Sequence, residues 1–183
     1  MKKVLLIVFC LLFLCSCKQK INYTYDINSR NADMSSYDGL SATNHMFKKI
    51  TVQELFNVID NKSSGVFYLG RENCSCCQIT TKYLNQVASD LNVTVYYIDV
   101  YDEQMPITDD YLKDKLTNYL YDIVAEIDGV KELQTPTIFS IVNGKTYDSL
   151  ICLSDWDWDP NPTKKQEKKL IDKYIRILTP FAE

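Results

Sequence analysis

Hydrophobic and polar positions along the chain predict a regular series of helices and strands. Continuous apolar runs at 66–69 and 93–100 are typical of buried strands of a parallel sheet. Between them, apolar residues at helical spacing predict a helix that begins at the cysteines, with Asn73 as N-cap, and that Asn92 closes. A capping box at 51–54 predicts an earlier helix over about 51–61. This order indicates parallel strands joined by a right-handed crossover.

The second half of the chain carries another helical pattern, a hairpin and a closing helix. Apolar residues between Leu112 and Ile127 predict a helix over about 108–129 that ends at Gly129. The run 135–142 predicts a strand, and Asn143-Gly144 predicts a tight turn into a partner strand at 145–153. A proline-stiffened loop is expected at 156–162, followed by an amphipathic helix over 163–178. Its inward face is expected to comprise Leu170, Ile171, Tyr174, Ile175 and Leu178.

The N-terminus has the pattern of an export signal. A basic start is followed by an apolar run at 4–14, which is too short to span a bilayer but suits a signal peptide. The run ends in Leu14-Cys-Ser-Cys17, which resembles a bacterial lipobox, so we expect a lipoprotein signal peptide at 1–16 and lipidation of Cys17. An uncleaved anchor and an ordinary signal peptide are the alternatives. Each of the three places the protein outside the cytoplasm, with lipidation anchoring it to the bacterial cell membrane.

The segment that follows is polar and lacks periodicity. Residues 17–46 are therefore expected to include the lipidated cysteine and a partly disordered tether, whose tyrosines could dock on the domain. The folded domain is expected at 47–183, a length that is sufficient for one hydrophobic core. The net charge of −4 gives no indication of a nucleic-acid partner. His45 is the only histidine and lies far in sequence from the cysteines, which argues against cysteine–histidine protease chemistry.

The chemistry of the chain centres on Cys74 and Cys77. Of the seven cysteines, three lie in the N-terminal segment and four in the expected domain. Cys74 and Cys77 have C-x-x-C spacing at the first turn of a helix, directly after a buried strand. The helix dipole and the unpaired amides at that position favour the thiolate, which is the reactive form of cysteine. This pattern predicts a thiol–disulfide redox site; a structural disulfide or two inert thiols are the alternatives.

The order of elements and motifs resembles the thioredoxin-like superfamily across about residues 47–183. Within that superfamily, Tyr68-Leu-Gly-Arg-Glu-Asn-Cys-Ser-Cys-Cys77 is similar to the Gly-Arg-x-x-Cys-x-x-Cys signature of bacteriocin-transport accessory proteins. The resemblance implies a three-layer α/β fold with a mixed central sheet flanked by helices. An extra helix is inserted before the strand that follows Thr135-Pro136.

The resemblance also implies roles for individual residues. Cys74 would be the nucleophile that forms a mixed disulfide with substrate, and Cys77 would resolve it, with neither a cofactor nor a metal. Pro136 would be a cis-proline whose bend presents the backbone of Thr135 to an extended substrate; an ordinary trans proline is the alternative. Arg71 would lower the pKa of Cys74 or contact substrate. Thioredoxins have a buried aspartate where this chain has Tyr68, so the carboxylate that shuttles protons is missing.

Cys76 is a possible third thiol and departs from the superfamily pattern. It could be a bystander, could compete with Cys77 in resolution, or could help to bind Cu(I) or Zn(II). Cys152 is expected to be a buried small hydrophobic residue rather than a partner.

The leading hypothesis from the sequence is a membrane-tethered oxidoreductase. Its substrates would be disulfides of exported proteins or peptides, and a membrane redox partner would supply or remove electrons. A non-catalytic module that binds a peptide or partner at Thr135-Pro136 is one alternative, and a copper- or zinc-handling lipoprotein is the other.

Overall fold

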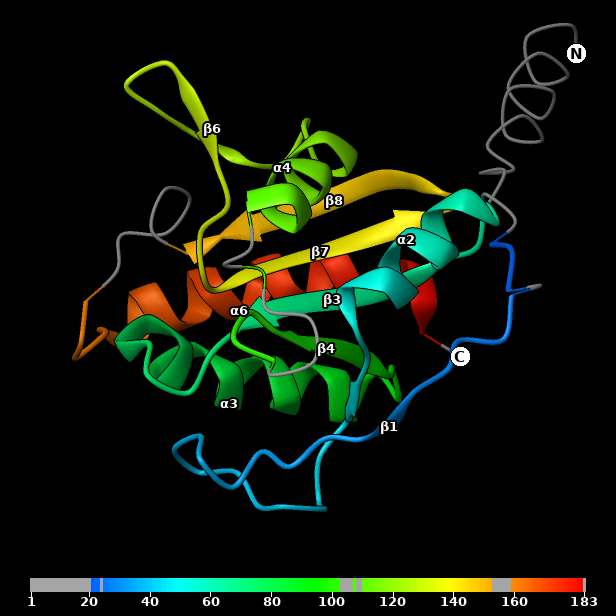
Figure 1. The fold of residues 1–183 in the computed structure, drawn as a ribbon. Helices are drawn as coiled ribbons and strands as arrows, with labels where there is room; N and C mark the ends of the chain where they lie inside the picture. Colours follow the sequence, from blue (N-terminus) through cyan, green and yellow to red (C-terminus); the bar gives the residue numbers. More distant parts are fainter. Residues whose placement is uncertain (1–20, 24, 103–106, 108–109, 153–158, 183) are drawn as a thin grey trace, which may run out of the picture.

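A central sheet runs through the molecule (Figure 1). The computed structural model describes residues 21–182 apart from 24, 103–106, 108–109 and 153–158. The six strands stand in the order β1-β2-β4-β3-β7-β8. Their bounds are Arg30–Asn31 for β1, Phe47–Lys49 for β2, Val95–Asp99 for β4, Gly65–Gly70 for β3, Thr137–Val142 for β7 and Lys145–Ile151 for β8.

The sheet is mixed, as expected. Strands β2, β4 and β3 are mutually parallel, whereas β7 pairs antiparallel with β3 and β8 pairs antiparallel with β7. The Asn143-Gly144 turn joins β7 to β8, and both residues have positive φ, of 52° and 77°. A β-carbon on Gly144 would lie only 2.6 Å from the carbonyl oxygen of Ile59, so this turn needs glycine both for its dihedral angle and for space.

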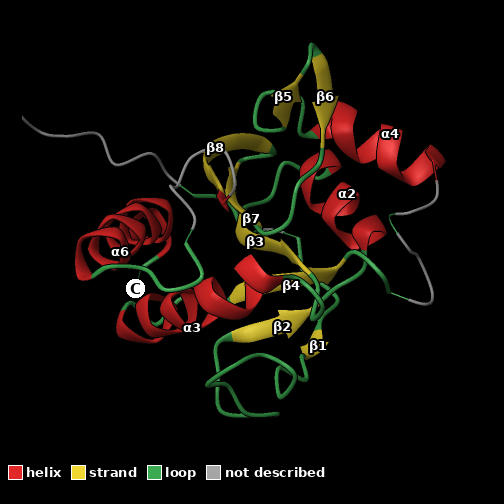
Figure 2. Ribbon diagram, turned by 90° about the vertical axis from the view of Figure 1, so that its left-hand side faces the viewer, coloured by secondary structure: helices red, strands yellow, loops and turns green. Residues whose placement is uncertain are grey.

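Helices cover both faces of the sheet and complete three layers (Figure 2). Helices α3 (Ser75–Asp90) and α6 (Lys164–Leu178) lie on one face, and α2 (Val52–Asp60) and α4 (Asp110–Tyr119) lie on the other. A single turn of 3-10 helix (Thr179–Phe181) follows α6. This is the α/β, thioredoxin-like arrangement that the sequence predicts, including the inserted helix α4 before β7.

Strand β3 divides the hydrophobic core because its side chains alternate between the two faces. Val66 and Tyr68 belong to the cluster under α3 and α6, whereas Phe67 and Leu69 belong to the cluster under α2 and α4. All residues of β3 are buried. The active-site strand is therefore held by packing on both faces and by neighbours on both edges, which fixes the position of whatever follows it.

Most helix ends match the sequence pattern, and two details differ. Thr51 caps α2, as the pattern at 51–54 predicts, and Thr163 caps α6 in a capping box with Gln166 that was not predicted. The N-cap of α3 is Cys74 itself and not Asn73, because the sulfur of Cys74 accepts the free amide of Cys77. On α6, Ile177 is buried whereas Ile175 is 41% exposed, which reverses the expected orientation of these two side chains.

The segment expected as one helix over 108–129 forms two different structures. Helix α4 ends at Tyr119, and β5 (Ala125–Ile127) pairs antiparallel with β6 (Val130–Glu132). Asp128 and Gly129 form the turn between these strands, with φ of 50° and 80°. An Asp-Gly pair is a strong hairpin signal, and here it outweighs the helical spacing of the apolar residues around it.

The folded unit begins before the expected boundary at residue 47. Strand β1 pairs with β2, and the side chains of Ala32, Met34 and Tyr37 are buried in the cluster under α3 and α6. The hydroxyls of Tyr37 and Tyr97 lie 3.0 Å apart. The second half of the polar segment is thus part of the domain, because its few apolar residues find a buried surface beside α3.

The predicted signal peptide and Cys17 lie outside the described residues, as do residues 156–158 of the predicted loop and several residues before α4. Within the described part of the chain, no helix combines the length and apolar character needed to cross a membrane.

Candidate active site

The turn after β3 places Cys74 at the N-terminus of α3. The backbone of Cys74 is extended, with φ of −114° and ψ of 112°, and its sulfur accepts a hydrogen bond from the amide of Cys77 at 3.2 Å. A sulfur in this position does what a serine or aspartate oxygen does at an ordinary N-cap. Negative charge on that sulfur is stabilised by the amide and by the positive end of the helix.

Thr135 and Pro136 lie opposite Cys74 and are joined by a cis peptide bond, as predicted. The carbonyl oxygen of Thr135 lies 3.6 Å from the Cys74 sulfur, which donates to it as a thiol. The Thr135 hydroxyl lies 3.9 Å from the same sulfur and donates to it. The structure therefore brings together three of the residues that the sequence assigns to the site.

The two cysteines of the pair have opposite acidities. The pKa of Cys74 is lowered to about 6, first by a hydrogen bond from the Cys77 thiol and then by the Cys77 amide, the Thr135 hydroxyl and the charge of Arg71. Burial raises the pKa of Cys77 far above its ordinary value, and the hydrogen bond that Cys77 gives to Cys74 raises it further. Cys74 is 8% exposed and Cys77 is fully buried. At neutral pH, Cys74 is the thiolate and Cys77 keeps its proton.

Arg71 lies within the electrostatic range of Cys74 and is held by Tyr101. Its guanidinium carbon is 5.2 Å from the centre of the Tyr101 ring, and Nη1 donates a hydrogen bond to the Tyr101 hydroxyl. Arg71, Tyr101 and Thr135 also line a pocket of about 510 Å³, with Leu69 and Leu133 among its apolar walls. The charge of Arg71 thus acts on Cys74, and a partly apolar recess adjoins Arg71 and Thr135.

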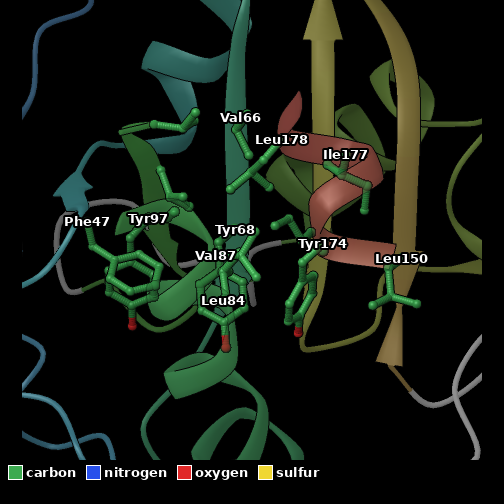
Figure 3. Packing of buried hydrophobic residues seen from close by; sticks show 14 of the residues in the cluster. Phe47, Val66, Tyr68, Leu84, Val87, Tyr97, Leu150, Tyr174, Ile177 and Leu178 are labelled. Atoms are coloured by element: carbon green, nitrogen blue, oxygen red, sulfur yellow. The ribbon is translucent and has the colours of Figure 1, made fainter. Parts of the chain in front are cut away.

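Tyr68 occupies the position of the missing carboxylate. Its side chain is buried under α3, and its hydroxyl lies 2.7 Å from the hydroxyl of Thr81 (Figure 3). A hydrogen bond from Tyr68 to Cys77 offsets part of the rise in the pKa of Cys77. Burial raises the pKa of Tyr68 itself well above 10, so it acts as a neutral donor.

Two further tyrosines lie within electrostatic range of Cys77, and no sequence pattern indicates that they meet there. Tyr97 and Tyr174 come from β4 and α6, and their hydroxyls lie at the same edge of the cluster as that of Tyr68 (Figure 3). Burial raises the pKa of both. Cys77 therefore lies among neutral hydroxyl groups rather than beside a carboxylate.

Cys76 is not a free third thiol, because it forms a disulfide with Cys152. The expectation that Cys152 is buried is confirmed, and the expectation that it has no partner is wrong. The two residues are 76 positions apart, so local sequence pattern could not pair them. Cys74 and Cys77 are the free cysteines in the described part of the chain.

The disulfide also bears on metal binding. The set Cys74, Cys76 and Cys77 would need three thiolates, and the sulfur of Cys76 is already bonded. Among the described residues, no group of three or more histidine, cysteine or acidic side chains is placed to hold a metal ion. His45 instead accepts the Phe47 amide at Nδ1, at 3.1 Å, and so has a local structural role.

Comparison with known proteins gives similarity in fold only. No family model and no curated protein matches the sequence. Thioredoxin from Fasciola hepatica is 18% identical, the match covering 69% of this chain and 94% of that one, with a TM-score of 0.40. Thioredoxin O2 from Arabidopsis thaliana in its oxidised state is 16% identical, covering 72% of this chain and 96% of that one, with a TM-score of 0.40.

These likenesses are loose, and the class of the protein is defined by its own topology and site. The parallel β2-β4-β3 set, the antiparallel β7 and β8 strands and the cis-proline beside a C-x-x-C helix make it a thioredoxin-fold protein. The lowered pKa of Cys74 and the raised pKa of Cys77 are those that thiol–disulfide exchange requires of an attacking and a resolving cysteine.

Proposed function

We propose that the protein is an extracytoplasmic, membrane-tethered thiol–disulfide oxidoreductase that acts on disulfides of exported proteins or peptides. The observation that carries the proposal is the state of Cys74. Cys74 is 8% exposed, its pKa is about 6, and its sulfur lies within 4 Å of Thr135, next to the cis-proline. Structural cysteines have no need of a lowered pKa, whereas an attacking thiol is most effective with a pKa near the ambient pH.

The exchange proceeds in two steps. The thiolate of Cys74 attacks one sulfur of a substrate disulfide, forms a mixed disulfide and releases the other substrate sulfur as a thiolate that takes up a proton. Cys77 then loses its proton and attacks Cys74, which forms the Cys74–Cys77 disulfide and releases the second substrate thiol. Two electrons pass to the substrate, and the reverse sequence oxidises a substrate dithiol.

Substrate recognition is assigned to the surface around the nucleophile. The backbone of Thr135 would pair with an extended peptide, and the pocket lined by Arg71 would take up a neighbouring side chain. The lipobox supports attachment to the membrane through Cys17, and a membrane partner would then recharge the cysteine pair. The Gly-Arg-x-x-Cys-x-x-Cys motif supports a place among accessory proteins of bacteriocin transport.

The test compares the purified protein with its Cys74→Ser variant in disulfide exchange with glutathione disulfide and with a disulfide-containing peptide. We expect exchange by the natural protein and its loss in the variant, while a control Cys17→Ser variant keeps full activity. Equal activity of the Cys74→Ser variant would refute the catalytic role. Binding of the peptide by both proteins without exchange would favour the non-catalytic binding module at Thr135-Pro136.

The anchoring part of the proposal has its own test. Cells that express the full chain are grown with radiolabelled palmitate, and the protein is recovered from the membrane fraction. Label in the natural protein and none in the Cys17→Ser variant is the expected result. Unlabelled protein in the membrane fraction would indicate an uncleaved anchor instead.

A further inference from the structure

The Cys76–Cys152 disulfide joins the active-site helix to the far strand of the sheet. Cys76 lies in the first turn of α3, two residues after the nucleophile, and Cys152 directly follows the last residue of β8. Both side chains are buried, at 4% and 2% exposure. Helix α3 otherwise packs chiefly along α6, so this bond is a direct covalent link between the start of α3 and the β7–β8 hairpin.

At the end of this link that lies next to the hairpin, the chain also contacts the cis-proline. The amide of Cys152 donates a hydrogen bond to the carbonyl oxygen of Pro136 at 3.1 Å. The neighbouring register pair is Thr137 opposite Ile151, so Cys152 stands beside Pro136 at the end of the ladder. The chain thus forms a closed circuit that runs from Cys74 to Cys76, across the disulfide to Cys152, through Pro136 to Thr135 and back to the sulfur of Cys74.

We propose that the Cys76–Cys152 disulfide is a positioning element that holds Thr135 against Cys74 and keeps Cys76 out of the exchange reaction. Only the second part of this inference, the exclusion of Cys76 from exchange, rests on the proposed oxidoreductase function. The contacts between Thr135 and the Cys74 sulfur are long, at 3.6 and 3.9 Å, and such bonds are lost when the groups separate by a further fraction of an ångström. A covalent link two residues away opposes that separation.

The second half of the proposal concerns which thiol resolves the mixed disulfide. While Cys76 is bonded to Cys152 it has no proton to lose and no thiolate to attack with, so Cys77 is the remaining resolving thiol. Opening the link takes two electrons and two protons and yields the two thiols of Cys76 and Cys152. The open form would then have a competing thiol next to Cys77.

The first experiment measures the pKa of Cys74 with and without the link. The rate of alkylation of Cys74 by iodoacetamide is followed from pH 4 to pH 9 by peptide mass spectrometry in the natural protein and in the Cys76→Ser/Cys152→Ser variant. The Thr135 hydroxyl contributes to the low pKa of Cys74. When this hydroxyl moves away from the sulfur, the pH at the midpoint of the alkylation profile should rise by about 0.5–1, and alkylation at pH 6 should slow by about two- to fivefold. A lower melting temperature with an unchanged midpoint would show that the link only stabilises the fold, and would overturn the proposal.

A double-mutant cycle separates positioning from a general loosening of the site. Thr135→Val removes the hydroxyl directly, and in the linked protein it should raise the midpoint by a similar amount. In the Cys76→Ser/Cys152→Ser background, Thr135→Val should add little, because the contact is already lost. Fully additive shifts would mean that the link does not act through Thr135.

The remaining measurements test the link itself and the choice of resolving thiol. Mass spectrometry of the full protein, purified without reductant, should find the Cys76–Cys152 peptide pair, and free thiols at both positions would overturn the proposal. In a Cys77→Ser variant, a mixed disulfide between Cys74 and glutathione should persist, and release at the natural rate would refute the exclusion of Cys76. A failure of the proposed function would give a different result. In that case the natural protein exchanges no substrate disulfide, although removal of the link still changes the pKa of Cys74.

Discussion

The hydrogen bond from Cys77 is the largest single cause of the low pKa of Cys74, and replacing Cys77 should show this directly. In Cys77→Ala the side-chain donor is lost, whereas the backbone amide at 3.2 Å from the Cys74 sulfur remains. In Cys77→Ser a hydroxyl donor of similar size stays in place. The two variants therefore form a matched pair that differs in one hydrogen bond to one sulfur.

The size of the effect follows from the strength of a hydrogen bond to a charged group. Such a bond contributes about 1.5–3 kcal/mol, and one pKa unit corresponds to about 1.4 kcal/mol. The pKa of Cys74 in Cys77→Ala should therefore rise from about 6 to about 7–8, while in Cys77→Ser it stays near its natural value. At pH 7 the thiolate fraction falls from about 0.9 to about 0.1–0.5, so alkylation of Cys74 slows by about two- to tenfold.

The assay is the pH dependence of the alkylation rate, because its midpoint reports the pKa of Cys74 independently of any substrate. The Cys76–Cys152 bridge is left intact in both variants, so Cys74 is the reactive thiol in the domain. Circular dichroism confirms that each variant is folded. If Cys77→Ala and Cys77→Ser have the same midpoint, the Cys77 thiol does not stabilise the Cys74 thiolate and the assigned asymmetry of the pair is wrong.

Three further measurements test other parts of the site. Arg71→Gln should raise the pKa of Cys74 by less than Cys77→Ala does, because the charge of Arg71 is the smallest of the named causes of the low pKa. The rise should be smaller in 1 M salt, which screens the charge. An unchanged midpoint of the alkylation profile would exclude Arg71 as a cause of the low pKa. Gly70→Ala should lower the free energy of unfolding in urea by about 1–3 kcal/mol, since a β-carbon there would meet the buried Tyr68 ring at 2.6 Å, and a smaller loss would show that the ring can yield. The reduction potential of the Cys74–Cys77 pair in glutathione buffers should lie above the value of about −270 mV typical of thioredoxin, and a lower value would contradict the stabilised thiolate.

The stability of the reduced protein should also depend on pH through the Cys74 thiolate. The pKa of Cys74 is about 6 in the folded protein against an ordinary value of 9.0, so the thiolate contributes stability that is fully present above pH 9 and is lost as the pH falls through 6. The raised pKa of Cys77 acts in the opposite sense only above its own unfolded value, near pH 9. Between pH 6 and pH 8, the melting temperature of the reduced protein should therefore rise relative to that of a Cys74→Ser control. Parallel plots of melting temperature against pH for the two proteins would contradict the low pKa assigned to Cys74.

Local sequence patterns predicted the parts of this fold that local forces decide. The buried run of β3, the Thr51 cap of α2 and the Asn143-Gly144 turn each have a physical cause within a few residues. The position of Cys74 at the start of a helix was correct for the same reason, whereas the cis bond at Thr135-Pro136 was expected from the resemblance to the thioredoxin-like superfamily. The helix predicted over 108–129 was wrong where the Asp128-Gly129 turn competed with apolar spacing.

The remaining features depend on contacts between distant segments. The Cys76–Cys152 bond spans 76 residues, and the docking of Tyr37 against Tyr97 spans 60. Neither has a periodic pattern or a spacing rule that would reveal it in a single sequence. The polar composition around Tyr37 is that of a tether, and only the buried surface beside α3 shows why this segment folds onto the domain.

The acidities of the cysteine pair, taken with the absence of a carboxylate at Tyr68, favour one direction of exchange. Reduction of a substrate requires Cys77 to lose its proton, yet burial raises its pKa, and the neighbouring Tyr68 is a neutral donor that cannot take the proton. Oxidation of a substrate begins with expulsion of Cys77, which takes up a proton, and ends with release of Cys74, whose low pKa makes it a good leaving group. A stabilised thiolate also stabilises the reduced form, so the oxidised protein readily gives up its disulfide. We therefore expect the Cys74–Cys77 pair to donate its disulfide more readily than it removes one from a substrate.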